Sequence, residues 1–469
     1  MHATLLLAAA LAAPADRPNV VVILADDLGF GDVSAMRAYG GAGDVRTPAI
    51  DSIFAGGLTF KNFYANCTVC SPTRAALMTG RFPASVGVPG VIRPWAEDNW
   101  GCPAEGRVFF PTLLRDAGYR TMLVGKWHLG GDDHNGRWNH PFDRGFDDHR
   151  GFRGGMLSDY VAHTRRFPDG TDRNVMTEPG TAGRHATDLF TDWAVEFLER
   201  SAADAATGDD RPFFLLLAYN APHTPIQPPA EWVAKVTARE PGIAPKRAKL
   251  VALVEHMDAG VGRVLAALDD TGLTGDTLVA FTSDNGGLLA AGAHNGPYRG
   301  GKEDLYEGGL RVPCAVRWPG VVKPGTTTAV RAATMDLAPT ILDAADGWGG
   351  TDADSLDVRG GMHGESLDDV LRGEEGPFAE GRALHFTRLE GRPAVWAGKT
   401  GDAVIAGDWK LVQNRPYQPR ELFNLADDPH EERDLAAANR PKLLELSQLM
   451  QDRRRLDGAV PFQAPAVAD

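Results

Sequence analysis

A cysteine at position 70 opens the short pattern whose residue types point most directly to chemistry. The pattern is Cys70-Ser71-Pro72-Thr73-Arg74, and residues 75–78, Ala-Ala-Leu-Met, favour a helix after it. Proline is accommodated in the first turn of a helix, so a helix is predicted to begin at Cys70. The free N–H groups at a helix start attract anions. The pattern therefore predicts an anion site beside a cysteine.

Other interpretations of this cysteine are weaker. Cys67 and Cys70 form a C-x-x-C pair, which occurs in redox motifs and as half of a zinc site. A zinc site would need a second pair of soft ligands, and the remaining cysteines, Cys102 and Cys314, stand far apart in the sequence. Both interpretations are therefore disfavoured.

Several apolar runs end abruptly in polar residues and predict the strands of a largely parallel sheet. Runs that are short and apolar on both faces indicate strands buried on both sides. Ligands of such sheets bind beyond the carboxyl ends of the strands. We therefore expect the polar residues that follow these runs to meet at one edge of the sheet. The runs are 19–24, 120–124, 213–217 and 277–282.

Two of the predicted strand ends carry hard oxygen ligands. Asp26 and Asp27 follow the first run, and Asp284 and Asn285 follow the last. Carboxylate and amide oxygens suit Ca²⁺ or Mg²⁺, whereas zinc prefers thiolates and histidines. Either pair alone could form a turn or cap a helix. Two pairs at one edge favour a metal site, for which we prefer Ca²⁺ to Mg²⁺.

The remaining strand ends and a later glycine-rich segment carry cationic or proton-transferring groups. Lys126 and His128 follow the second run, His223 follows the third, and Lys302 comes after two glycines. Such groups can hold the oxygens of a sulfuryl or phosphoryl group and move protons. A lone lysine or histidine is more often a surface residue, so the hypothesis requires that these four come together.

The order of these segments resembles that of the type I sulfatases. The cysteine pattern matches their C-x-P-x-R signature, and 125–130, 220–225, 283–287 and 299–302 follow in the family's order and approximate spacing. The resemblance extends from about Pro18 to about Asp434. It implies an α/β fold of the alkaline phosphatase superfamily, with a large mixed, mostly parallel sheet sandwiched by helices. It also implies a smaller C-terminal domain with an antiparallel sheet and a terminal helix.

The resemblance further implies a modified cysteine and a metal site. In that family a formylglycine-generating enzyme oxidises the cysteine to formylglycine, whose hydrate supplies the nucleophilic oxygen. Cys70 is then a precursor. The implied metal ligands are the modified Cys70 and the four oxygen-bearing residues at the strand ends, Asp26, Asp27, Asp284 and Asn285.

The same resemblance assigns roles to the basic residues. Arg74 and Lys126 would hold the hydrate and the sulfate oxygens. His128 would act as a base on the hydrate, whereas His223 and Lys302 would contact the sulfate and protonate the leaving oxygen. One polar position that the family carries somewhere in 145–155 is not assigned.

The implied reaction is hydrolysis of a sulfate ester to an alcohol and inorganic sulfate, with a sulfated carbohydrate or an aryl sulfate as substrate. A phosphonate or phosphoester hydrolase on the same scaffold is one alternative, and a non-catalytic carbohydrate-binding protein is another. The formal net charge of −14 argues against a nucleic-acid partner, so a sulfated substrate needs a locally basic pocket. Scattered arginines are usually solvated, but five could line its rim: Arg144, Arg150, Arg153, Arg165 and Arg166.

The ends of the chain suggest its location and its domain boundaries. Residues 1–15 resemble a secretory signal peptide, and their apolar stretch is shorter than the about 20 residues of a membrane span. We therefore expect a periplasmic or secreted protein without a membrane anchor. A catalytic domain is expected over 16–375, a C-terminal subdomain over 376–456 and a disordered tail over 457–469. The last helix should pack through Leu443, Leu444, Leu446 and Leu449.

Overall fold

The computed structural model describes residues 17–93, 103–104, 106–130, 139–166, 171–348, 361–374, 382–389 and 400–458. The expected signal peptide, the expected domain boundary at residue 375 and nearly all of the expected tail lie outside these residues. Within the described part of the chain, no helix is both long enough and apolar enough to cross a membrane.

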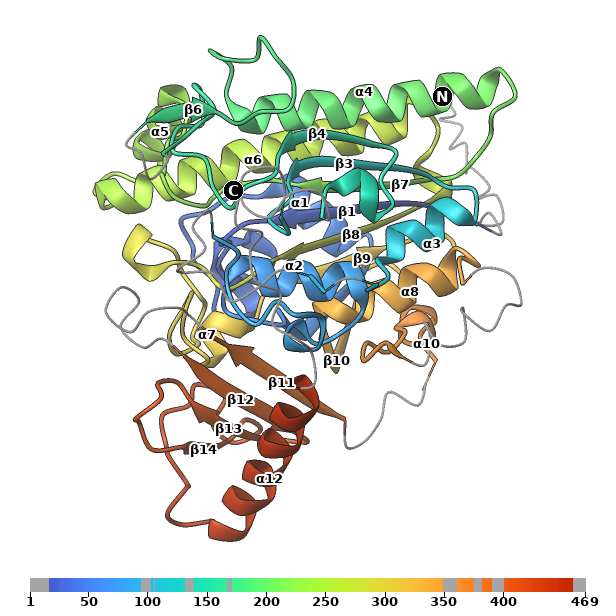
Figure 1. Ribbon diagram of the computed structural model, residues 1–469. Coiled ribbons are helices and arrows are strands. Elements are labelled where there is room, and N and C mark those ends of the chain that lie inside the picture. The colour runs from blue at the N-terminus through green and yellow to red at the C-terminus, as the bar shows by residue number, and fades with distance from the viewer. Residues whose placement is uncertain are drawn as a thin grey trace, which may run out of the picture.

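An eight-stranded sheet forms the centre of the larger part of the molecule, in the order β10-β2-β9-β8-β1-β7-β3-β4 (Figure 1). Neighbouring strands are parallel except where β9 pairs antiparallel with β2 and β8. The expected large, mixed and mostly parallel sheet is thus confirmed. The strands are β1 (Asn19–Ala25), β2 (Leu58–Tyr64), β3 (Arg120–Lys126), β4 (Asp148–Phe152), β7 (Phe213–Ala218), β8 (Thr277–Ser283), β9 (Cys314–Arg317) and β10 (Thr326–Ala333).

The strands predicted from the apolar runs are neighbours in the middle of this sheet. In the register, Ala25 of β1 lies beside Ser283 of β8, and Ala218 of β7 lies beside both Leu24 of β1 and Gly125 of β3. The four carboxyl ends are therefore level with one another. The polar residues that follow them share one edge, as the sequence predicts.

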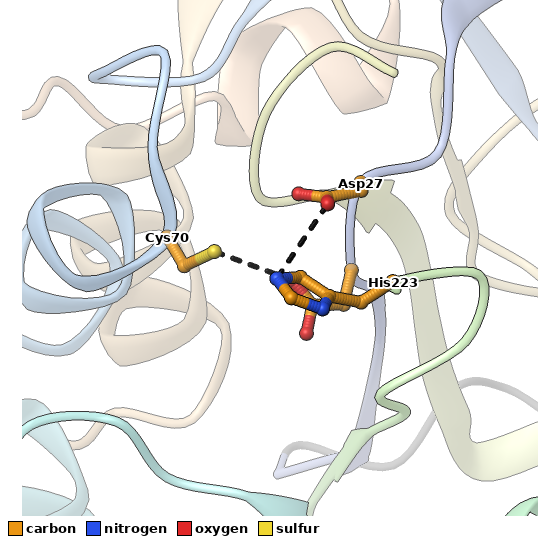
Figure 2. Close-up of side chains that lie close together, drawn as sticks. Asp27, Cys70 and His223 are labelled. Carbon is orange, nitrogen blue, oxygen red and sulfur yellow. Dashed lines mark hydrogen bonds and ion pairs between the residues drawn. The ribbon is translucent and has the colours of Figure 1, made fainter. Parts of the chain in front are cut away.

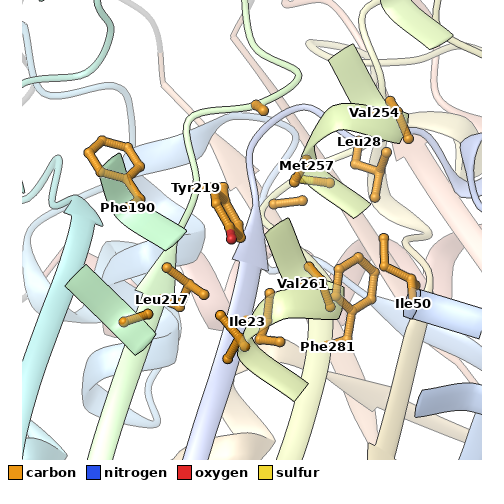
Figure 3. Packing of buried hydrophobic residues seen from close by; sticks show 14 of the residues in the cluster. Ile23, Leu28, Ile50, Phe190, Leu217, Tyr219, Val254, Met257, Val261 and Phe281 are labelled. Carbon is orange, nitrogen blue, oxygen red and sulfur yellow. The ribbon is translucent and has the colours of Figure 1, made fainter. Parts of the chain in front are cut away.

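Helices cover both faces of the sheet because the side chains of each strand alternate between two cores. Val21 and Ile23 of β1 enter the core beneath α4 and α6, which Figure 3 shows from close by, whereas Val20 and Val22 enter the core on the opposite face. The first face carries α1 (Pro48–Ala55), α4 (Ala186–Ala206), α5 (Ala230–Arg239) and α6 (Pro245–Asp270). The second carries α2 (Cys70–Thr79), α3 (Phe110–Asp116), α8 (Leu337–Ala344) and α10 (Asp368–Arg372).

A smaller antiparallel sheet, β11-β12-β13-β14, and a final helix form the C-terminal part, as expected (Figure 1). Leu446 and Met450 of that helix are buried against the sheet, but Leu444 is 57% exposed, so its predicted packing role is wrong. Two residues span about 200° around a helix, which places Leu444 opposite Leu446. The elements are β11 (Ala383–Arg388), β12 (Gly401–Ala406), β13 (Trp409–Gln413), β14 (Glu421–Asn424) and α12 (Arg440–Asp457).

A buried ionic cluster joins the small sheet to the main one. Lys410 of β13 places its Nζ 2.9 Å from Glu307 Oε1 and 2.8 Å from Glu431 Oε1. Glu307 begins α7 (Glu307–Leu310) and also pairs with Arg311 at 2.7 Å. Buried charges are tolerated when they are paired in this way. The cluster fixes the segment that directly follows Lys302, so the small sheet supports one side of the predicted site.

Candidate active site

The structure brings the predicted site residues together at the carboxyl edge of the main sheet. The edge residues come from three kinds of position: directly after strands, at the start of α2, and on the loop before α7. They are Asp26 and Asp27 after β1, Lys126 and His128 at β3, His223 after β7, Asp284 and Asn285 after β8, Cys70 and Arg74 on α2, and Lys302 on the loop.

Cys70 is the first residue of α2, where the sequence places it, and its side chain is 3% exposed. Its Sγ donates to Asp26 Oδ1 at 3.3 Å and lies 3.9 Å from Lys302 Nζ. Figure 2 shows the thiol pointing toward the ring of His223. Burial, and then the charge of Asp26, raises the pKa of the thiol well above its usual value. A reactive cysteine is favoured by the opposite shift.

The oxygen-bearing residues form a buried cluster beside this cysteine. Asp27 Oδ1 accepts a hydrogen bond from Asn285 Nδ2 at 2.8 Å, and Asp284 Oδ1 accepts one from the Asp27 amide at 3.2 Å. Possible ligand atoms of Asp26, Asp27, Cys70 and His223 all lie within 4.8 Å of one another. The carbonyl oxygen of the buried Asn285 side chain makes no hydrogen bond. The carboxylate and amide oxygens among these groups fit a hard divalent cation.

Arg74 links the carboxylate cluster to the end of β3. Its Nε donates to Asp284 Oδ2 at 2.9 Å, and its Nη1 donates to the carbonyl oxygen of Lys126 at 2.8 Å. The guanidinium is buried and lies one helical turn after Cys70. The spacing of four residues between the cysteine and the arginine therefore directs both side chains toward the same edge.

Two lysines pair with the carboxylates that follow β1. Lys126 Nζ lies 2.6 Å from Asp26 Oδ2, and Lys302 Nζ lies 2.7 Å from Asp27 Oδ2. Burial alone would raise the pKa of Asp26, but Lys126 and further cations lower it below its usual value. Burial, and then the charge of Asp26, raises the pKa of Asp284 to about 7. An added cation would favour the charged form of both carboxyl groups.

His128 has a defined tautomer. Its Nε2 lies 3.0 Å from the carbonyl oxygen of Ile92, which can only accept, so Nε2 carries the hydrogen. Burial, and then the charge of Lys126, lowers the pKa of His128 well below its usual value. The ring is therefore neutral, and Nδ1 holds the lone pair that a base needs.

One ring nitrogen of His223 is bound to the backbone, and the second ring nitrogen faces the site. Its Nδ1 donates to the carbonyl oxygen of Thr224 at 2.6 Å, and its Nε2 lies 3.6 Å from Asp27 Oδ2 on the side that faces Cys70 (Figure 2). Burial, and then the charge of Lys302, lowers the pKa of His223. The ring therefore lies close to both Cys70 and Asp27.

Some residues that shape the site escaped the sequence analysis. The buried Tyr160 places its hydroxyl 2.6 Å from the Asn220 carbonyl and 2.7 Å from the His223 carbonyl, which fixes the loop after β7. A Cβ at Gly155 would lie 2.3 Å from His128 Nε2, so only glycine leaves room for that ring. Gly154 and Gly155 are adjacent, and a pair of glycines is a sequence signal of a turn or loop.

A pocket of about 370 Å³ opens next to the cysteine. Of the arginines considered for its rim, Arg165 and Arg166 line it, whereas Arg144 holds Asn139 and Arg150 pairs with Glu196. Within 145–155 only Gly155 reaches the wall. Among the residues that the structure describes, those that line it are Val69, Cys70, Val91, Ile92, Arg93, His128, Gly155, Met156, Ser158, Arg165, Arg166, His223, Lys302 and Glu303.

A mostly parallel sheet between helices, with acidic and basic side chains gathered at its carboxyl edge, is the architecture expected for the alkaline phosphatase superfamily. The family model described as Sulfatase matches residues 18–347, and the model described as N-sulphoglucosamine sulphohydrolase, C-terminal, matches residues 301–456. The chain therefore belongs to the sulfatase family and is a sulfuric ester hydrolase.

Individual relatives agree with this assignment. Arylsulfatase A of Homo sapiens is 32% identical over 99% of this chain and 93% of its own length. N-acetylgalactosamine-6-sulfatase of Sus scrofa is 32% identical over 70% of this chain and 62% of its own length. The structure of Ps i-CgsB in complex with k-i-k-neocarrahexaose has a TM-score of 0.80 and 29% identity, and the match covers 96% of this chain and 95% of that chain.

The same fold also occurs in a phosphonate monoester hydrolase. That enzyme, from Silicibacter pomeroyi, has a TM-score of 0.66 and 22% identity, and the match covers 94% of this chain and 96% of that chain. At this identity only the fold is shared.

Proposed function

We propose that the chain hydrolyses the sulfate ester of a sulfated carbohydrate, with formylglycine made from Cys70 and one bound Ca²⁺ ion. The observation that carries the proposal is the position of Cys70. It lines the pocket, and its Sγ lies 3.3 Å from Asp26 Oδ1 and 3.9 Å from Lys302 Nζ, among the carboxylates and lysines of the sheet edge. Relatives named for N-acetylgalactosamine-6-sulfate and a structure with a bound neocarrahexaose support a saccharide substrate.

The buried side chains indicate how the groups would be held. Asp26, Asp27, Asp284, Asn285 and the modified residue 70 would bind the cation. Possible ligand atoms of Asp26, Asp27 and Cys70 lie within 4.8 Å of one another, and the unpartnered Asn285 oxygen supports its inclusion. When present, the cation offsets charge on the sulfate oxygens, and the formylglycine hydrate supplies the attacking oxygen. Mg²⁺ is the less favoured ion, because it demands near-ideal octahedral geometry.

The basic residues would have different roles toward the substrate. Arg74 and Lys126 would orient residue 70 and the sulfate, since both reach the carboxylates around Cys70. The lone pair on His128 Nδ1 would accept a proton from the hydrate. His223 and Lys302 would contact the sulfate. A bound sulfate ester adds negative charge beside His223, which raises the pKa of its ring and prepares it to protonate the leaving oxygen.

Maturation and location complete the proposal. Because Cys70 is 3% exposed, a formylglycine-generating enzyme would have to act before the fold closes over it. The resemblance of residues 1–15 to a signal peptide supports a periplasmic or secreted enzyme that meets its sulfated substrate outside the cytoplasm.

A pair of matched substrates tests the reaction. We expect protein from a host that makes formylglycine to hydrolyse 4-nitrophenyl sulfate with a higher kcat/KM than 4-nitrophenyl phosphate, because the leaving group is identical and only the transferred group differs. The release of 4-nitrophenol measures both rates. A higher kcat/KM for the phosphate would favour the phosphoester hydrolase instead, and no hydrolysis of either ester would favour the carbohydrate-binding alternative.

Replacement of His128 and replacement of His223 should slow different steps of the reaction. His128→Ala should release about one equivalent of alcohol per enzyme in a burst and then release sulfate slowly, because the base for the second half of the reaction is missing. His223→Ala should slow a sugar sulfate more than 4-nitrophenyl sulfate, because a more basic leaving oxygen depends more on protonation.

Removal of a proton-transfer group costs about 10²–10⁴-fold in rate. Rapid-mixing measurements of alcohol and sulfate release distinguish the two variants. If both variants show the same leaving-group dependence and neither gives a burst, the roles of the two histidines are wrong, and Lys302 becomes the preferred proton donor.

A further inference from the structure

The loop that carries Lys302 contains an unusual backbone conformation. Lys302 Nζ lies 2.7 Å from Asp27 Oδ2 and 3.9 Å from Cys70 Sγ. The next residue, Glu303, has a φ of 78°, in the left-handed region that residues other than glycine rarely adopt. Such a conformation persists only where the surrounding structure enforces it. The position of Lys302 therefore depends on the contacts that hold Glu303.

Both backbone polar groups of Glu303 are bound by other segments of the chain. Its N–H donates to the carbonyl oxygen of Thr68 at 3.0 Å, two residues before Cys70. Its own carbonyl oxygen accepts from Arg388 Nη1 at 2.5 Å. One contact thus comes from the segment that leads into α2, and the other comes from the small C-terminal sheet. Together they account for the left-handed conformation.

Arg388 reaches this loop from a fixed backbone. It is the last residue of β11, an edge strand of the small sheet, and its side chain is 1% exposed. The residues on either side of it also contact the main part of the molecule. Cys67 Sγ donates to the carbonyl oxygen of Thr387 at 3.4 Å, and the amide of Leu389 donates to the carbonyl oxygen of Pro89 at 2.8 Å. The end of β11 is therefore held directly against the site.

The contact of Arg388 with the Glu303 backbone matters more than its contact with the Glu303 carboxylate. The carboxylate is 25% exposed and lies 3.6 Å from Arg388 Nη2, which is longer than a hydrogen bond. The carbonyl oxygen accepts from a charged and buried donor, and hydrogen bonds of that kind are the strong ones. Loss of the guanidinium should therefore release the backbone of the loop, not only one ion pair.

We infer that Arg388 is a positioning residue of the active site. By holding Glu303 in its left-handed conformation, it keeps Lys302 Nζ beside Asp27 and Cys70. The inference rests on the proposed function, in which Lys302 contacts the sulfate and assists the leaving oxygen. It gives the small sheet a part in the reaction, although Arg388 acts only through the loop.

A double-mutant cycle with Lys302 tests this role. Arg388→Gln should lower kcat/KM for 4-nitrophenyl sulfate by about 10–100-fold, because a displacement of about 1 Å can cost about 10²-fold in rate. In a Lys302→Ala background the same substitution should lower kcat/KM by less than about twofold, because no lysine remains to be positioned. A purely structural role of Arg388 would lower kcat/KM equally in both backgrounds.

A conservative variant and a matched control accompany the cycle. Arg388→Lys should restore part of the activity, because an ammonium group can still donate to the Glu303 carbonyl. Arg382→Gln is the control. Arg382 directly precedes β11 and is largely buried, but it pairs with Asp336 at 2.6 Å, just before α8. Its effect on kcat/KM should be the same with and without Lys302, and thermal melts compare the stability of the variants.

Two substitutions at Glu303 test the backbone conformation with Arg388 still in place. Glycine adopts a positive φ freely, whereas a β-branched valine is strongly disfavoured there. Both substitutions remove the carboxylate, so the comparison reports on the backbone. Glu303→Val should have a kcat/KM at least about tenfold below that of Glu303→Gly, and Lys302→Ala should remove this difference.

The outcomes separate the inference from the proposed function. Additive effects of Arg388→Gln and Lys302→Ala would overturn the inference, as would equal kcat/KM values for Glu303→Val and Glu303→Gly. Full activity of Lys302→Ala would overturn it as well, because Arg388 would then have no lysine to act through. A wild-type enzyme that does not hydrolyse 4-nitrophenyl sulfate would instead overturn the proposed function.

Discussion

Cys70→Ala should abolish sulfate release from 4-nitrophenyl sulfate and leave the fold intact. Loss of a nucleophile costs on the order of 10⁶-fold in rate. The thiol lines the pocket, 3.3 Å from Asp26 Oδ1, and the proposal makes it the precursor of the attacking group. The substitution removes one buried atom, which should cost only about 1 kcal/mol of stability. Sulfate release and a thermal melt measure the two effects.

Cys67→Ala is the matched control for this experiment. Cys67 is also buried and stands three residues earlier, but its Sγ donates to the Thr387 carbonyl at 3.4 Å and it does not line the pocket. It should retain most of the activity. Mass spectrometry of the peptide that contains residue 70 should show an aldehyde in active wild-type protein. Full activity with an unmodified thiol at that position would refute the formylglycine proposal.

The sequence predicted the site well where local pattern and strand geometry coincide. Short, β-branched apolar runs such as 19–24 favour buried strands, and parallel strands place their carboxyl ends at one edge. Asp26 and Asp284 therefore meet although they are 258 positions apart, as the pairing of β1 with β8 shows. The helix at Cys70 was also predictable, because proline in a first turn is a local signal.

The pocket walls could not be predicted in the same way. Ile92 supports His128, and Gly155 makes room for it, through contacts between segments that no local pattern connects. The pKa of Cys70 could not be predicted from local sequence either. A helix start favours an anion, but burial and the charge of Asp26 outweigh that effect, and burial is a property of the whole fold.

The arginines show that a sequence pattern can limit the candidates for the pocket wall without identifying them. The alternation of side chains along β5 (Thr164–Arg166) buries Arg165 and exposes Arg166, but only the folded chain shows that both of them line the pocket. Arg150 was a candidate on the same grounds, but it lies elsewhere and pairs with Glu196.

Asp284→Ala should remove the bound divalent cation and with it nearly all activity. We expect about one Ca²⁺ per chain in the wild-type protein by elemental analysis, and almost none in the variant. Asp284 contributes a hard oxygen, holds Arg74 at 2.9 Å and accepts from the amide of Asp27, so its loss also disorders the neighbouring ligands. Charged carboxylates that are buried without a cation destabilise the fold. The remaining side chains of the site are therefore not expected to keep their positions once the ion is gone.

A second group of possible ligands provides the control. His185, Asp188 and His256 also lie close together, but both ring nitrogens of His185 are engaged, Nδ1 by the Thr187 amide and Nε2 by the Gln227 carbonyl. Asp188→Ala should therefore keep its Ca²⁺. Stoichiometric zinc in the wild-type protein, or equal Ca²⁺ in wild type and Asp284→Ala, would reject the metal site.

Thermal stability separates loss of the ion from loss of the fold. A ligand that binds only the folded state at about 100 times its Kd stabilises it by about 2.7 kcal/mol. Added Ca²⁺ should therefore raise the Tm of chelator-treated wild-type protein and of Asp188→Ala, but not that of Asp284→Ala. Mg²⁺ should raise the Tm less at the same concentration, because six to eight flexible oxygens suit Ca²⁺ and a strict octahedron suits Mg²⁺. The reverse order would identify Mg²⁺ as the ion that Asp26, Asp27, Asp284 and Asn285 bind.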